Sequence, residues 1–88
     1  MLTTEVEIVN KLGLHARPAT MLVKTAAKYK SKITIKKEDL SVDAKSIMGV
    51  LILAAQKGAK LTIEVDGEDQ EDAMREVVKL FGDGFGEE

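Results

Sequence analysis

The sequence predicts an α+β fold, an open-faced sandwich of order βαββαβα in which a four-stranded antiparallel sheet carries helices on one face. Three observations lead to this prediction. Four segments alternate apolar and polar residues, as strands with one buried face do, and the segments between them repeat apolar residues at helical spacing. The chain has 88 residues, which suits a single domain over 1–88.

The first strand and the first helix follow from two different periodicities. Over residues 2–9, Val6 and Ile8 lie on one side of an alternating pattern, which is typical of a strand. Over residues 16–27 the apolar residues recur at helical spacing. Pro18 suits the first turn of this helix, because the amides of a first turn have no intrahelical acceptor.

A hairpin is predicted in the middle of the chain. It joins a strand over 32–37 to a short third strand around Leu40 and Val42. The connecting residues, Glu38 and Asp39, lack the glycine that tight two-residue turns prefer. We therefore expect a looser turn at this point.

A short apolar helix and a fourth strand come next. The helix begins at Ser46 and is expected to end before Gly58, because glycine suits a helix stop. The alternating stretch from Lys60 to Val65 reads as the fourth strand, and Gly67 ends it.

The last helix begins after Asp69, a residue type that commonly forms the N-cap. Its apolar residues recur from Ala73 to Phe81, and acidic residues in its first turn suit the helix dipole. The glycine-rich tail, 82–88, is expected to be frayed, and the sequence offers no role for Phe85.

Composition excludes several classes of function. The chain has no cysteine and one histidine, which excludes a thiolate or multi-histidine metal site. No metal and no cofactor are expected. Thirteen basic against fifteen acidic residues give a net charge of −2, and with only three aromatic residues this argues against direct nucleic acid binding. The N-terminus has no signal-peptide pattern and no apolar run is long enough for a membrane span, so a cytoplasmic protein without membrane insertion is expected.

The single histidine, His15, lies where the first loop meets the first helix. At this N-cap position the amides of Ala16 and Arg17 have no helical acceptor, and a helix N-terminus with free amides is an anion site. Pro18 helps to hold these amides, and the guanidinium of Arg17 suits the oxygens of a phosphate. The alternative is a surface or capping histidine without chemistry.

These features predict a phosphoryl acceptor. The helix dipole and the neighbouring cation disfavour the imidazolium, which keeps the ring of His15 neutral and nucleophilic near pH 7. A neutral imidazole nitrogen can accept a phosphoryl group and pass it on. The sequence has no P-loop, so it has no means of taking that group from ATP by itself.

Ser46 is either an ordinary N-cap residue or a phosphorylation site. Capping alone would contribute about 1 kcal/mol. A phosphate at this position would suit the helix dipole and add about two negative charges to the surface. The apolar run that follows has more apolar residues than one face of a short helix can bury, so either the helix lies deep or part of the run, Met48 included, forms a docking surface.

Two segments resemble the signatures of a known family. Residues 10–19, Asn-Lys-Leu-Gly-Leu-His-Ala-Arg-Pro-Ala, are similar to the active-site signature of the histidine-containing phosphocarrier proteins, HPr. Residues 45–50, Lys-Ser-Ile-Met-Gly-Val, resemble the regulatory-serine signature of the same family. The spacing of the two segments and the βαββαβα order agree with it.

The resemblance implies a role in the phosphoenolpyruvate-dependent sugar phosphotransferase system. His15 would accept a phosphoryl group on Nδ1 from Enzyme I and pass it to the IIA domains of sugar permeases, with Arg17 stabilising the phosphate. Ser46 would be modified by HPr kinase/phosphorylase, and the modified form would recruit a catabolite-control transcription factor. The docking residues implied are Thr20, Lys24, Ile47, Met48 and Leu51.

Other functions stay open beside this one. The chain could be a regulatory binding module in catabolite or nitrogen-related control that acts mainly through phosphorylation of Ser46. It could also be an inert adaptor whose apolar patch binds partners without phosphate. For the phosphocarrier a monomer is expected, because a small carrier that visits several partners need not be more than a monomer.

Overall fold

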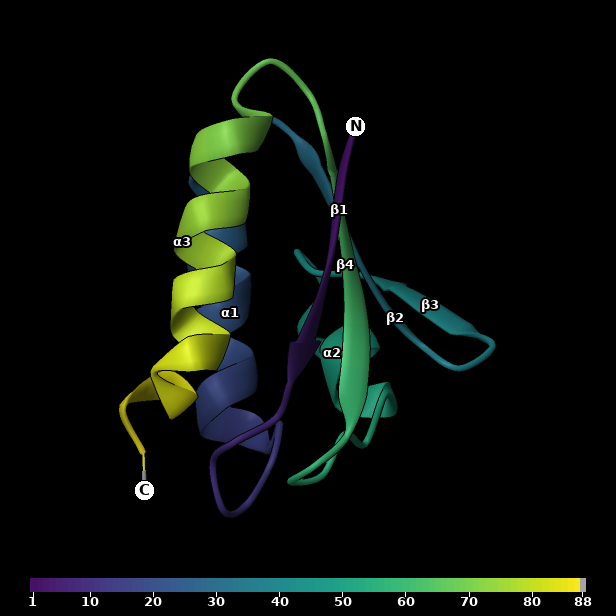
Figure 1. Cartoon of the computed structure of the whole chain (residues 1–88), viewed down its shortest axis with the longest axis vertical. Helices are drawn as coiled ribbons and strands as arrows, with labels where there is room; N and C mark the ends of the chain where they lie inside the picture. Colours follow the sequence, from purple (N-terminus) through teal and green to yellow (C-terminus); the bar gives the residue numbers. More distant parts are fainter. Residues whose placement is uncertain (88) are drawn as a thin grey trace.

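The computed structural model describes residues 1–87 and confirms the predicted fold class (Figure 1). The elements follow the predicted order. They are β1 (Leu2–Glu7), α1 (Ala16–Ala27), β2 (Lys32–Lys37), β3 (Leu40–Asp43), α2 (Ile47–Ile52), β4 (Lys60–Asp66), α3 (Gln70–Gly82) and a 3₁₀ turn, η1 (Gly84–Gly86).

The four strands form one antiparallel sheet in the order β1-β4-β2-β3. The two central strands, β4 and β2, therefore have neighbours on both sides. Figure 1 shows α1 and α3 side by side on one face of the sheet, and α2 packs against α1 and β3. The N-terminus of α1 and the C-terminal tail lie at the same end of the molecule (Figure 1).

The core lies between the sheet and the helices. In β2 and β4 every second side chain is buried, as the alternating sequence predicts. Apolar stripes of α1 and α3 cover this face, as in any layered fold with one core. The largest fully buried apolar side chains are Ile8, Leu22, Ile33, Ile35, Val50, Leu53, Leu61, Ile63, Val65, Val77 and Phe81.

The prediction of a loose hairpin turn is wrong. Lys37 pairs with Leu40, so the turn between β2 and β3 contains only Glu38 and Asp39. Glu38 adopts the left-handed region, with φ +53°, where a glycine would be less strained. Strand pairing on both sides holds the tight turn despite this residue.

Two element ends also differ from the prediction. Strand β1 ends at Glu7, and Ile8 continues into the core outside the strand. Helix α2 ends at Ile52, well before Gly58, because Ala54 takes a left-handed conformation with φ +48°. Gly58 instead lies in the turn before β4, with φ +91°.

Asp69 is the N-cap of α3 by position, but its side chain does not cap the helix. Its carboxylate accepts hydrogen bonds from the backbone N–H groups of Lys30 and Ser31, at 2.8 and 2.9 Å, and from the Ser31 hydroxyl. The hydrogen bond from the Ser31 hydroxyl holds the pKa of Asp69 below its ordinary value. The residue therefore ties α3 to the loop before β2.

The expectation of a frayed tail is wrong for residues 82–87, and residue 88 lies outside the described residues. Phe85 is only 2% exposed, and its ring packs edge-on against Phe81 with ring centroids 5.0 Å apart and an interplanar angle of 72°. Burial of this aromatic side chain orders the segment despite the conformational freedom of the glycines around it. The tail thereby returns to the body of the domain.

Candidate functional site

The site is built at the N-terminus of α1, where the preceding loop fixes the position of His15. Gly13 has φ +70°, and a Cβ there would overlap the carbonyl oxygen of Ala55. The next residue, Leu14, is buried and its N–H donates to the same carbonyl at 2.9 Å. The loop is thus held against the segment after α2, and His15 follows at the N-cap with extended backbone, φ −77° and ψ −172°.

The amides at the start of α1 are available to an anion. Among residues 1–87, no side chain or carbonyl accepts from the N–H groups of Ala16 and Arg17. Pro18 is buried in the first turn, whereas Arg17 is exposed. Free amides, a helix dipole and an exposed guanidinium together suit an oxyanion with two charges.

The imidazole of His15 is half-buried, with 35% of its side chain exposed. Its Nε2 lies 3.0 Å from both carboxylate oxygens of Glu87, which comes from the tail. Asn10, which is buried, donates from Nδ2 to the same carboxylate at 3.1 Å. The hydrogen bond with His15 is the main reason that the pKa of Glu87 lies below its ordinary value.

This arrangement leaves one ring nitrogen available for chemistry. Nε2 is engaged by Glu87, and no hydrogen bond joins Nδ1 to any of the residues 1–87. The ring is not sealed in the core, and the neighbouring N–H groups are not occupied by protein oxygens in the described chain. A nucleophilic nitrogen beside an anion site is the chemistry that the sequence predicts.

Glu87 and Asn10 are members of this site that the sequence analysis missed. Asn10 stands inside the segment 10–19 and could have been considered there. Glu87 lies 72 positions from His15, in a tail without periodicity, so no local signal connects the two. The buried Phe85, two residues earlier, holds the tail near His15.

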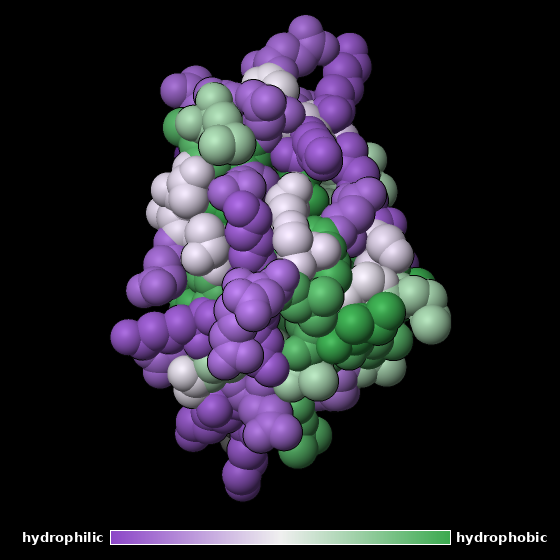
Figure 2. Space-filling view, turned by 90° about the vertical axis from the view of Figure 1, so that its right-hand side faces the viewer, coloured by the Kyte–Doolittle hydropathy of each residue, from purple (hydrophilic) through white to green (hydrophobic). Residues whose placement is uncertain are grey.

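Ser46 is the N-cap of α2, and its hydroxyl oxygen accepts from the Gly49 N–H at 3.1 Å. The helix does not lie deep. Figure 2 shows a hydrophobic patch on one face of the molecule, at the level of α2 in Figure 1. Among the large apolar side chains exposed on α2 are Ile47 (37%), Met48 (66%), Leu51 (36%) and Ile52 (60%).

The other predicted docking residues lie on the neighbouring helix. Thr20 and Lys24 are exposed on α1, one turn apart, and α1 packs against α2. The Thr20 hydroxyl donates to the carbonyl of Ala16 at 2.8 Å, which links it to the first turn. The structure thus brings the implied docking residues onto two adjacent helices, with His15 at the start of one of them.

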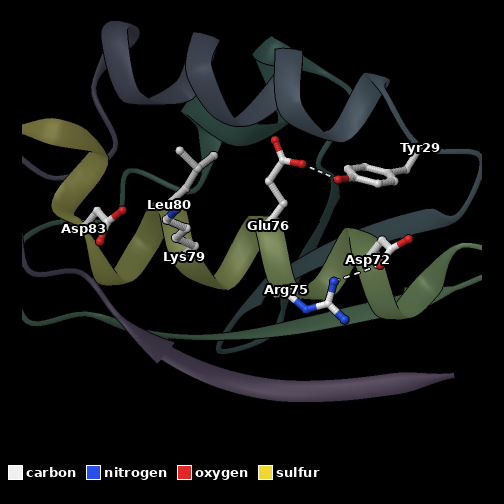
Figure 3. Close-up of a pocket in the computed structure, with 7 residues that line it drawn as sticks. All are labelled: Tyr29, Asp72, Arg75, Glu76, Lys79, Leu80 and Asp83. Carbon is white, nitrogen blue, oxygen red and sulfur yellow. Dashed lines mark hydrogen bonds and ion pairs between the residues drawn. The ribbon is translucent and has the colours of Figure 1, made fainter.

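A groove along α3, bordered by Tyr29 from the segment after α1, is a separate feature (Figure 3). Four of its polar side chains bond in pairs: Tyr29 donates to Glu76, and Arg75 donates to Asp72 at 2.8 Å. The bond to Glu76 raises the pKa of Tyr29 to about 12. The groove contains none of the site residues and is lined by Tyr29, Asp72, Arg75, Glu76, Lys79, Leu80 and Asp83.

Two further findings concern residues 1–87 as a whole. The described residues contain no group of three or more histidine, cysteine, aspartate or glutamate side chains placed to hold a metal ion. Within the same range, no helix combines the length and the apolar character that crossing a membrane requires.

Comparison with known proteins identifies the family. The family model described as "PTS HPr component phosphorylation site" matches residues 2–83, almost the whole chain. The chain belongs to the HPr family of the phosphotransferase system. It is therefore an HPr-type phosphocarrier, as the two signature segments suggest.

Individual members of the HPr family agree with this assignment. The phosphocarrier protein HPr of Neisseria meningitidis is 46% identical over 87 residues, 99% of this chain and 98% of its own. The crystal structure of HPr from Thermoanaerobacter tengcongensis superposes with a TM-score of 0.96 at 43% identity, covering 100% of this chain and 99% of that one. Crh of Bacillus subtilis, described as a catabolite repression protein that forms a swapped dimer, has a TM-score of 0.77 at 34% identity, covering 96% and 97% of the two chains.

Proposed function

We propose that the chain carries a phosphoryl group on Nδ1 of His15, which it accepts from Enzyme I and passes to the IIA domains of sugar permeases. The observation that carries this proposal is the half-exposed imidazole at a helix N-terminus with free amides, with Nδ1 as its unengaged nitrogen. Membership of the HPr family supplies the partners.

The transfer requires one bond to form and one to break. The lone pair on Nδ1 forms a bond to phosphorus while the bond between phosphorus and the donor atom of Enzyme I breaks. The donor atom keeps that electron pair, and Nδ1 has no proton to lose. In the second transfer an acceptor atom of the IIA domain forms a bond to phosphorus while the bond between phosphorus and Nδ1 breaks, and Nδ1 recovers its lone pair. The chain is therefore a protein substrate and not a turnover enzyme.

The amides of Ala16 and Arg17 and the Arg17 guanidinium would bind the oxygens of the phosphoryl group. Backbone donors that need no rearrangement stabilise such charge efficiently. Thr20 and Lys24 on α1 and Ile47, Met48 and Leu51 on α2 would contact the partner. Apolar side chains rimmed by charge suit a protein interface of this kind.

Labelling with phosphoenolpyruvate and Enzyme I tests the proposal. One acid-labile phosphoryl group per chain is expected on the wild type and none on His15→Ala. His15→Asn is a second variant, which keeps a polar side chain of similar size and should also remain unlabelled. Labelling of either variant at the wild-type level would place the acceptor elsewhere and refute the assignment.

A second function, regulation through Ser46, is favoured by a specific observation. The Ser46 hydroxyl lies on the surface beside the apolar face of α2, so a phosphate there would change the same docking surface. HPr kinase/phosphorylase would add it from ATP, and a catabolite-control transcription factor would bind the product. The likeness to Crh, at 34% identity, gives this role modest support.

Acid treatment separates the two modifications. Phosphate on Ser46 is an ester and survives acid, whereas phosphate on an imidazole nitrogen does not. ATP and the kinase should label the wild type and His15→Ala equally, and Ser46→Ala not at all. An acid-stable label that persists in Ser46→Ala would contradict this second role.

A further inference from the structure

We propose that Glu87 is a positioning residue for His15: its carboxylate orients the ring through Nε2 and balances the positive charge that the ring gains when Nδ1 is phosphorylated. The inference rests on the proposed function, because it concerns the same acceptor. It assigns a role in phosphoryl transfer to the C-terminal tail.

The contact between the two side chains defines which ring nitrogen carries a proton in the neutral imidazole. A carboxylate can only accept hydrogen bonds, so Nε2 must carry a proton when it lies 3.0 Å from both oxygens of Glu87. In the neutral ring the other nitrogen, Nδ1, then has the free lone pair. The nitrogen that attacks phosphorus is thus selected by the residue that binds the opposite side of the ring.

The carboxylate itself is held in place from a second direction. Asn10 donates from Nδ2 to the Oε1 atom of Glu87 at 3.1 Å and to the carbonyl of Gly13 at 2.8 Å. The Oδ1 atom of Asn10 is buried without a hydrogen-bond partner among residues 1–87. The orientation of the amide therefore satisfies its N–H donors and leaves its oxygen unsatisfied. Glu87 is the less exposed partner of the pair, at 15% against 35% for His15.

The tail adopts a strained conformation to deliver this carboxylate. Phe85 has φ 55° and ψ 29°, a region that a bulky side chain rarely adopts. Burial of its ring against Phe81 stabilises the turn. Strain of this kind persists only where surrounding contacts enforce it, and it concentrates at functional sites. Here the turn directs the chain, two residues later, to His15.

The charge balance of the transfer explains why a carboxylate is useful. In the form that reacts, the ring is neutral, with a proton on Nε2 and a lone pair on Nδ1. When that lone pair bonds to phosphorus, both nitrogens are substituted and the ring becomes a cation. The Glu87 carboxylate lies against the proton of that cation and stabilises it, as a carboxylate stabilises the imidazolium of a catalytic triad.

Glu87→Ala and Glu87→Gln separate orientation from charge. Glutamine keeps an oxygen that can accept from Nε2, but it has no charge, whereas alanine removes both. A matched control is Glu5→Gln, which removes the same charge from an exposed position on β1. Phe85→Ala tests whether the buried ring holds the carboxylate in place.

The first readout is the Nε2 proton of His15 in NMR spectra of ¹⁵N-labelled protein. In the wild type and Glu5→Gln we expect this proton to resonate downfield, because it is hydrogen-bonded to a carboxylate. It should move upfield in Glu87→Gln and exchange too fast to observe in Glu87→Ala and Phe85→Ala. A tail that only stabilises the fold would leave this proton unchanged in Glu87→Gln.

The second readout is the kinetics of phosphorylation by Enzyme I. Loss of the carboxylate charge should lower kcat about tenfold in Glu87→Gln, and Glu87→Ala, which loses the hydrogen bond as well, should be slower still. KM should be nearly unchanged in both variants, because Glu87 contacts the ring at Nε2, on the opposite side from the reacting Nδ1. Glu5→Gln should match the wild type. Thermal unfolding of each variant establishes that the fold is intact.

The outcomes distinguish the two proposals. If the wild type accepts no phosphoryl group on His15, the proposed function fails. If the wild type is labelled on His15 but both Glu87 variants retain its kcat and its Nε2 resonance, only the role of Glu87 is refuted. Faster transfer in the variants would also overturn it, because the carboxylate would then oppose the incoming dianion.

Discussion

The ring of Phe85 packs edge-on against the ring of Phe81, with centroids 5.0 Å apart, and this contact fastens the tail to α3. Both rings are buried. Two residues beyond Phe85, the chain reaches the imidazole at the start of α1. One aromatic pair therefore connects the end of the chain to its candidate site.

Phe85→Ala should lower the free energy of unfolding by about 3 kcal/mol, at the low end for a buried phenylalanine, because a terminal segment can detach without opening the core. Urea denaturation followed by circular dichroism measures this. Leu12→Ala is the control, because Leu12 is 72% exposed and should change stability little. Equal stability of the two variants would mean that the tail contributes nothing to the fold.

Arg17→Ala should slow phosphorylation of His15 without weakening the fold. The side chain is exposed, so the free energy of unfolding should change by no more than about 0.5 kcal/mol. The rate with Enzyme I should fall about tenfold or more, because a charged donor to the phosphoryl oxygens is lost. Arg17→Lys should recover only part of the rate, since an ammonium cannot bind two oxygens with a planar fork. Normal rates in Arg17→Ala would remove this residue from the mechanism.

Gly13→Ala should destabilise the chain by about 3 kcal/mol or more. The residue has φ +70°, and a Cβ would lie 2.9 Å from the Cα of Gln56 and closer still to the carbonyl oxygen of Ala55. Thermal unfolding checks the prediction. Gly82→Ala is the matched control, because a Cβ there meets no atom within 4 Å. If the two variants unfolded alike, the loop before His15 would be looser than its contacts imply.

The stability of the fold should depend on pH through Asp69. Its pKa is lowered in the folded state, chiefly by the hydrogen bond from the Ser31 hydroxyl. A carboxyl with a depressed pKa stabilises the fold above its unfolded pKa, and this stabilisation is lost as the pH falls through the folded value. The melting temperature of the wild type should therefore decrease on acidification over the ordinary carboxyl range and below it.

Asp69→Asn isolates this contribution. At neutral pH the variant should have a lower melting temperature than the wild type. The difference between the two melting temperatures should decrease as the pH is lowered, since asparagine does not titrate. Asp39→Asn, at an exposed position in the hairpin turn, should show little difference at any pH. A gap for Asp69→Asn that stays constant with pH would rule out ionisation as its cause.

Local patterns were sufficient for the elements but not for all of their ends. Alternation identified the strands, because one face of each is buried, and helical spacing identified the helices for the same reason. The prediction of a loose hairpin turn was wrong because strand pairing imposes a positive φ on Glu38. The residue preferences of tight turns do not favour glutamate in that conformation. The predicted end of α2 was wrong because Ala54, and not a glycine, takes the left-handed conformation that follows the helix.

In the candidate site, too, the residues near helix starts were predicted from the sequence, whereas the long-range contacts were not. His15, Ala16, Arg17 and Ser46 were predicted because N-cap positions and free first-turn amides are local properties of a helix start. Asp69 was predicted to cap its own helix, yet its carboxylate bonds to the distant Ser31. The side chain had two partners available, and tertiary packing selected the distant one.

By itself the sequence determined the order of the elements, the face that each one buries and the segment that carries the nucleophile, since all of these depend on residues within one or two turns of each other. Only the tertiary structure decided that Phe85 is buried, that the tail lies near His15 and that Glu87 engages Nε2. Contacts between positions 72 residues apart arise when the whole core assembles, so no short-range pattern encodes them.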